Sequence, residues 1–273
     1  MFINYLRLNL IRFFKGRSAR LAILISVAFI LLIYAYIGIV LLAAKDSINM
    51  MIDGREDIGP AAISQVVLMG TSFFYVPVAT GVVGSGFICS YYTFKSYYNL
   101  EIGMRNKTLF CISEYSVLVI LCLILTLITT FGMLAMEPFI PSGNSMMADG
   151  NEFWFLVTFG MEMMIGLNDC SNALLSAKLF RKTGKSILFF LFYWASTLVL
   201  SAVLTNVLPT KYQIFNLILF PTFINWFAND TPIFLQNVAS NKYIMVFGLV
   251  IKIIVQMALS VMLFNRKVEE KRV

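Results

Sequence analysis

Three charged residues lie inside apolar stretches that are long enough to cross a membrane. Glu162 and Asp169 are seven residues apart in one stretch, and this spacing places both side chains on the same face of a helix. Lys252 lies in another stretch, one helical turn before Gln256. A charge in lipid is costly, so such residues usually face a charged partner or a water-filled cavity.

The depth of these charges in the membrane suggests how they interact. Glu162 and Lys252 each lie nine residues beyond the predicted start of their span, which puts both roughly 14 Å into the membrane at 1.5 Å per residue. We therefore predict either a Glu162–Lys252 ion pair or an acidic lining, shared with Asp169, that faces a cationic substrate. The alternative is that each charge snorkels to the interface or hydrogen-bonds locally.

The remaining motifs do not predict catalysis. The sequence has no histidine, which is the commonest general base and metal ligand. The segment TGKS at 183–186 resembles the end of a phosphate-binding loop, but Leu179 stands where that loop needs glycine and no buried strand precedes it. The four cysteines lack CxxC spacing, so we expect buried, reduced thiols. We predict no enzyme activity, no metal and no cofactor bound by this chain.

A glycine-rich segment, GVVGSG at 81–86, also lies within an apolar stretch. Small residues in such a position permit close packing of neighbouring helices. We predict this packing role here and no phosphate binding.

The composition is that of an integral membrane protein. Hydrophobic residues make up 59% of the chain and charged residues 13%, against about 45–50% and a quarter in soluble proteins. The net charge of +7 could indicate nucleic-acid binding. The placement of the cations favours a membrane surface instead, so we predict no nucleic-acid partner.

Six segments approach or exceed the roughly twenty apolar residues that a helix needs to span a bilayer. Backbone groups in lipid must be satisfied within the segment, and no strand-like alternation recurs, so we predict an all-α fold in one transmembrane domain, 1–273. The first segment is too long for the apolar region of a signal peptide, so we expect a retained anchor. The predicted spans are 21–44, 63–90, 112–136, 153–177, 187–208 and 243–264.

Positive charge gives the orientation. Cations gather at the N-terminus, in the segment 91–110, around Lys178–Lys185 and in the C-terminal tail, whereas the intervening loops are mainly acidic. This alternation fits six spans with both termini in the cytoplasm. We predict a multi-pass protein of the cell membrane.

Two further segments are predicted to lie at the membrane surfaces. Residues 1–17 form an amphipathic helix with Asn9 and Arg12 on its polar side, as in interfacial helices of the inner leaflet, although a simple basic leader is an alternative. The apolar stretch 212–228, in the outer region 209–242, has Pro221 near its centre. A re-entrant segment bent at Pro221 preserves the charge pattern, and a helix lying on the surface is the alternative.

The segment YYTFKSYYNLEIGMRNKTLF, 91–110, resembles the coupling region of type-2 ABC exporter permeases. In that family the second helix continues into the cytosol and turns into a short helix that docks on a separate ATPase. The residues that carry the resemblance are Phe94, Lys95, Glu101, Gly103 and Arg105. The six spans, the N-terminal helix and the re-entrant segment are also similar to that family, but the family often has a lysine near the position of Glu114.

A docking role suits the chemistry of this segment. Tyr97 and Tyr98, with the neighbouring aromatic residues, could anchor it in a groove, while Lys95, Glu101 and Arg105 could fix its register. A glycine at 103 permits the reversal into the next span. The alternative is an interfacial loop whose tyrosines lie among lipid headgroups.

The resemblance implies a permease subunit that works with two cytosolic ABC ATPase subunits, which bind ATP and Mg²⁺, and with a second permease copy or a sister permease. Small permeases of this kind resemble Gram-positive exporters of amphipathic peptides, such as phenol-soluble modulin exporters and lantibiotic immunity permeases. We therefore expect a toxin or antimicrobial peptide as cargo. The alternatives are export of a lipid-linked polysaccharide or teichoic acid, and a stand-alone immunity or carrier protein.

Overall fold

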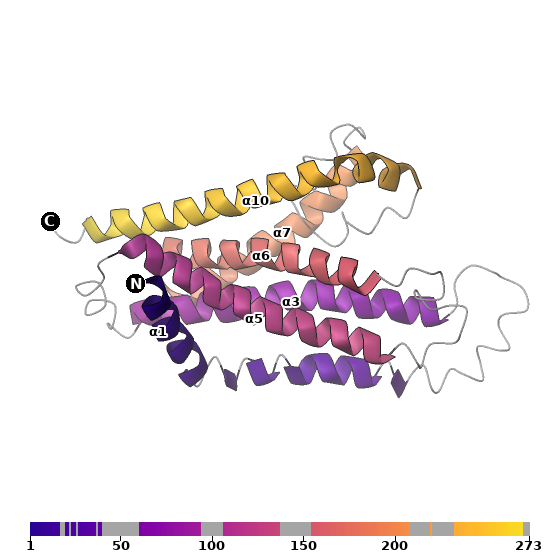
Figure 1. Ribbon diagram of the computed structural model, residues 1–273, viewed down its shortest axis with the longest axis horizontal. Coiled ribbons are helices and arrows are strands. Elements are labelled where there is room, and N and C mark those ends of the chain that lie inside the picture. The colour runs from indigo at the N-terminus through magenta and orange to yellow at the C-terminus, as the bar shows by residue number, and fades with distance from the viewer. Residues whose placement is uncertain are drawn as a thin grey trace, which may run out of the picture.

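The computed structural model describes residues 1–16, most of 20–39, 60–93, 106–136, 154–207, 219 and 232–269. Within these ranges every regular element is a helix and no strand occurs, which confirms the all-α prediction. The long helices lie side by side, and α1 crosses one end of the bundle (Figure 1). The helices are α1 (Phe2–Lys15), α3 (Pro60–Thr93), α5 (Lys107–Met136), α6 (Trp154–Phe180), α7 (Thr183–Val207) and α10 (Pro232–Glu269).

Three of these helices contain stretches long and apolar enough to cross a membrane. The stretches are Lys107–Gly132 in α5, Thr183–Leu200 in α7 and Val246–Asn265 in α10. The chain is therefore a helical membrane protein. Helices α3 and α6 cover most of two other predicted spans, and the described residues among 20–39 are also helical. The count of six spans stays a prediction.

The helix boundaries follow from local chemistry. Asn106 caps α5, because its Oδ1 accepts a hydrogen bond from the N–H of Leu109 at 3.0 Å. Helix α6 ends at Phe180, and the next residue, Arg181, has a φ of 55°, the left-handed conformation more usual for glycine. The N–H of Arg181 still donates to the carbonyl of Ala177 at 2.9 Å. This tight turn sends α7 back along the bundle.

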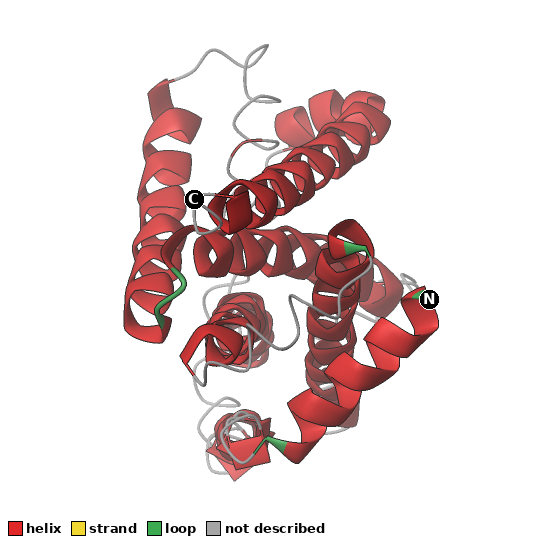
Figure 2. Cartoon of the chain, turned by 90° about the vertical axis from the view of Figure 1, so that its left-hand side faces the viewer, coloured by secondary structure: helices red, strands yellow, loops and turns green. Residues whose placement is uncertain are grey.

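Helix α6 is the centre of the bundle. It packs against α3, α5, α7 and α10, and its residues Ala173, Leu174 and Ala177 are fully buried. Helix α1 packs against the start of α5 and lies at one side of this end of the bundle (Figure 2). The bundle therefore places α1 beside the point where α3 ends and α5 begins.

The glycine-rich segment acts as the predicted packing surface. A side chain at Gly81 would overlap the buried ring of Phe190 in α7, and a Cβ at Gly84 would lie 2.9 Å from Leu118 in α5. Small residues at these positions let α3 approach both neighbours closely. The prediction of close helix packing in GVVGSG is confirmed.

Gly81→Ala is expected to destabilise the bundle, with Gly86→Ala as its matched control. Both changes add one methyl group to α3, but the nearest neighbour of a Cβ at Gly86 is Thr183 Cγ2 at 4.0 Å. Because overpacking typically costs 1–3 kcal/mol, we expect Gly81→Ala to lower the free energy of unfolding by about that amount and Gly86→Ala to change it little. Denaturant unfolding in detergent micelles measures both, and equal values for the two variants would contradict this packing account.

Candidate functional site

The residues predicted to dock an ATPase lie outside the described part of the chain, as does Pro221. They are Phe94, Lys95, Tyr97, Tyr98, Glu101, Gly103 and Arg105. The structure instead describes the two ends of the segment 91–110, on either side of residues 94–105, which we call the insert. Tyr91 and Tyr92 lie at the end of α3, and Asn106 immediately precedes α5.

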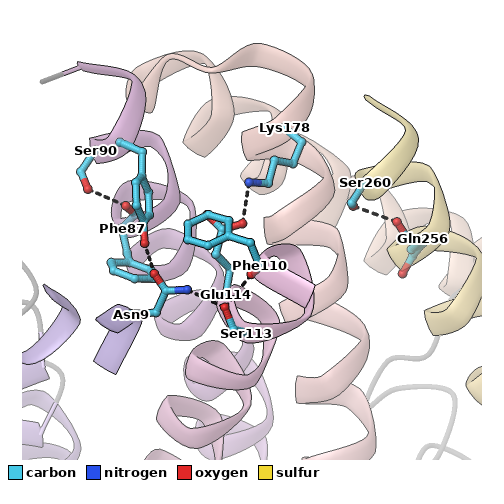
Figure 3. Close-up of polar contacts among 10 residues, drawn as sticks. Asn9, Phe87, Ser90, Phe110, Ser113, Glu114, Lys178, Gln256 and Ser260 are labelled. Carbon is cyan, nitrogen blue, oxygen red and sulfur yellow. Dashed lines mark hydrogen bonds and ion pairs between the residues drawn. The ribbon is translucent and has the colours of Figure 1, made fainter. Parts of the chain in front are cut away.

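The end of α3 is joined to α1 and α5 through Asn9, which is fully buried. The hydroxyl of Tyr91 donates a hydrogen bond to Asn9 Oδ1. Asn9 Nδ2 in turn donates to Ser113 Oγ at 2.7 Å, so one amide links three helices (Figure 3). Its loss would leave buried polar atoms without partners, which typically costs 1–3 kcal/mol per group.

The position of Asn9 corrects the predicted orientation of α1. The sequence placed Asn9 and Arg12 on a polar side and the apolar residues against the membrane. The helix itself is confirmed, but it turns Asn9 and Phe13 into the bundle, while Ile3 is 75% exposed. The reason is that buried hydroxyl partners on α3 and α5 satisfy the amide, which a helical wheel does not represent.

Arg12 adds a cation to this site. Its guanidinium carbon lies 3.1 Å from the ring centroid of Tyr91, in a cation–π contact. Burial lowers the pKa of the Arg12 guanidinium, while the nearby Tyr91 and Glu114 raise it. An arginine side chain is not deprotonated in proteins, so Arg12 places a positive charge near Glu114.

Glu114 and Lys178 form a fully buried ion pair between α5 and α6. Glu114 Oε2 and Lys178 Nζ are 2.5 Å apart, and both side chains are 1% exposed. The ammonium also lies 4.3 Å from the ring centroid of Phe264 in α10. Breaking a buried pair by removing one partner is strongly destabilising, so this contact fixes three helices. We call Asn9, Arg12, Tyr91, Ser113, Glu114 and Lys178 the α1 cluster.

The far end of the insert also contacts α1. The N–H of Asn106 donates a hydrogen bond to the hydroxyl of Tyr5 at 3.4 Å, and Tyr5 packs edge-on against Phe110. Both ends of the insert are therefore joined to the same helix, Tyr91 through Asn9 and Asn106 through Tyr5. Within the described ranges, no group of histidine, cysteine or acidic residues could hold a metal ion.

The spacing of two charged residues in the sequence indicates the Glu114–Lys178 ion pair, which the predictions above did not include. Glu114 lies near the start of the third predicted span and Lys178 just beyond the end of the fourth. Consecutive spans run in opposite directions, so these positions fall at the same end of the bundle. Opposite charges at equal depth on neighbouring helices would have predicted the pair.

The structure does not bring Glu162 and Lys252 together as an ion pair. Glu162 Oε1 accepts a hydrogen bond from Thr129 Oγ1 at 2.9 Å. Lys252 Nζ donates to the carbonyl of Leu219 at 2.6 Å, and its charge interacts with that of Asp169. The predicted Glu162–Lys252 ion pair is therefore wrong, and Glu162 makes the local hydrogen bond that was the alternative.

The register of α6 against α10 explains this difference. The two helices run in the same direction (Figure 1), and Gln256 Nε2 donates to Asn172 Oδ1 at 2.6 Å. Lys252, four residues before Gln256, is therefore level with position 168. Glu162 lies about 9 Å from that position, nearer the start of α6, at 1.5 Å per residue. The predicted depth of Lys252 was wrong because it was counted from residue 243, whereas α10 begins at Pro232.

No family model and no curated protein matches this sequence.

Variants of the buried ion pair should show strong coupling. Glu114→Gln and Lys178→Met each leave an unpaired charge in the core, so we expect each to lower the free energy of unfolding by about 3–5 kcal/mol. The double variant removes both charges and should be more stable than either single variant. Denaturant unfolding in detergent measures this double-mutant cycle. Lys182→Met, at an exposed lysine, is the matched control and should have little effect. Additive losses in the double variant would contradict the pairing.

Proposed function

We propose that this chain is the membrane-spanning permease subunit of an ATP-driven exporter, and that the insert 94–105 docks a separate cytosolic ATPase. The observation that carries the proposal is the attachment of both ends of the insert to α1. Tyr91 reaches α1 through Asn9, and Asn106 reaches it through Tyr5. A surface that receives mechanical work must be attached to the helices that it moves.

The α1 cluster supplies a route for this motion. A displacement of the insert that separated Tyr91 from Asn9 would leave buried polar atoms unpaired, at about 1–3 kcal/mol for each group. Movement of α1, α3 and α5 together avoids this penalty. The Glu114–Lys178 pair then carries the displacement from α5 to α6, the central helix. Packed helices shift as units in such transitions.

The rest of the proposed assembly follows from the charge pattern and the resemblance. The permease has six spans, a re-entrant segment bent at Pro221 and both termini in the cytoplasm of a cell membrane. It works with two ATPase subunits, which hold ATP and Mg²⁺, and with a second permease. The cargo is an amphipathic peptide. Helices α7 and α10 support contact with lipid or a second permease, since apolar side chains such as Phe192 and Phe247 are 73% and 66% exposed.

Photo-crosslinking from the insert tests the ATPase partner. A photoreactive residue in place of Tyr97, in the chain expressed in its native host, should capture a protein that hydrolyses ATP. The same residue in place of Met146, in a predicted outer loop, is the matched control and should not capture it. Arg105→Glu should reduce the capture because it reverses a charge at the docking surface. Full transport activity of the chain alone in lipid vesicles would overturn the proposal.

Tyr91→Phe separates docking from transmission. It removes the hydroxyl that donates to Asn9 but leaves the insert unchanged. We expect the ATPase to bind as before while its stimulation by amphipathic peptides falls several-fold, in line with the 1–3 kcal/mol cost of an unpaired buried acceptor. Tyr36→Phe, at a tyrosine that is 68% exposed, is the matched control and should keep full stimulation. Unchanged stimulation in Tyr91→Phe would exclude this route of coupling.

A further inference from the structure

A second group of polar side chains lies in the middle of the bundle, away from the α1 cluster. Asp169 of α6 is 5% exposed, and its Oδ1 accepts hydrogen bonds from two amides, Asn168 Nδ2 at 3.1 Å and Asn172 Nδ2 at 3.3 Å. Gln256 of α10 holds Asn172 in place through the hydrogen bond to Asn172 Oδ1. Tyr193 of α7 lies beside Asn172 and Asp169. Three helices therefore surround one buried carboxylate.

The cation nearest to this carboxylate is bound elsewhere. Lys252 interacts electrostatically with Asp169, but its Nζ donates to the backbone carbonyl of Leu219 at 2.6 Å. No ion pair joins Lys252 to Asp169 among the described contacts, so the donors that touch the carboxylate are neutral amides. A buried carboxylate without a cation in direct contact is costly.

Asn168 provides a second, independent observation at this place. Its side chain is 3% exposed, and its Oδ1 has no hydrogen-bond partner. Its amide nitrogen donates to Asp169, so the unpartnered oxygen belongs to the same amide group that contacts the carboxylate. Asp169 and Asn168 thus offer a negative charge and a neutral acceptor on adjacent residues of α6. An ammonium group, with three N–H donors, matches this combination.

We propose that Asp169 and the unpartnered carbonyl oxygen of Asn168 form an ammonium-binding site that receives a lysine side chain of a cationic amphipathic peptide, with Lys252 as the internal competitor. Lys252 donates to the Leu219 carbonyl, which leaves Asp169 and Asn168 free of direct contact with a cation. Rotation of Lys252 towards Asp169 would exclude the peptide lysine. The inference rests on the proposed function for the nature of the cargo, and it names the charge that the cargo carries.

Peptide binding to the chain alone tests this site without any ATPase. The purified chain is placed in nanodiscs of phosphatidylcholine, which has no primary amine, and empty nanodiscs give the background. The probes are a helical leucine–lysine peptide and its analogue with glutamine in place of lysine. We expect the lysine peptide to bind about tenfold more tightly, because only its ammonium forms charge-assisted hydrogen bonds. Equal affinities for the two peptides would overturn the proposal.

Four variants test which residues cause the tighter binding of the lysine peptide, called the preference below. Asp169→Asn keeps the shape of the side chain but should abolish the difference between the peptides. Asn168→Leu keeps the carboxylate and should reduce the difference, which guards against misfolding of the first variant. Lys252→Gln removes the competitor and should increase the difference. Glu162→Gln is the matched control, a buried acid of the same helix that bonds to Thr129, and it should leave the preference unchanged.

The outcomes separate this inference from the proposed function. A preference that survives Asp169→Asn, or that is lost equally in Glu162→Gln, would overturn the site even if an ATPase is captured at Tyr97. A preference that depends on Asp169, in a chain that captures no ATPase, would support the site and count against the exporter. An unchanged preference in Lys252→Gln would exclude the competing role of Lys252.

Discussion

The ion pair between Glu114 and Lys178 is the contact on which the arrangement of the helices most depends. Both charges are almost fully removed from solvent, where neither is tolerable without the other. The pair therefore allows one placement of α5 against α6. Phe264 of α10 covers the ammonium, and Arg12 of α1 brings a second cation towards the carboxylate. Four helices are positioned by a single electrostatic requirement.

Apolar packing alone would not give this precision. The outer surfaces of α7 and α10 are apolar, and in lipid such side chains gain little by choosing one neighbour over another. Hydrogen bonds between helices determine which helices pack together and in which register. Tyr34 donates to the carbonyl of Thr129 at 2.7 Å, and Gln256 donates to Asn172 at 2.6 Å. Each bond fixes how far one helix is displaced along another.

Helix α6 connects the two polar regions of the molecule. Lys178 lies in the α1 cluster, and Asp169 lies nine residues away in the middle of the bundle, about 14 Å at 1.5 Å per residue. In the proposed exporter, a displacement received at the insert would reach the ammonium-binding site through this one rigid helix. The same helix would carry the effect of bound peptide back to the insert.

The sequence by itself determined the helical class, the membrane character, the amphipathic N-terminal helix and the close packing at Gly81. These features depend on composition and on spacing within one segment, which a sequence displays directly. The tertiary structure alone decided which polar groups meet. Asn9 looked solvent-facing until Tyr91 and Ser113 enclosed it, and Lys252 lay level with position 168 rather than with Glu162. Such pairings depend on the rotation and relative displacement of whole helices, and a shift of six residues along a helix moves a charge by about 9 Å, from one acid to another.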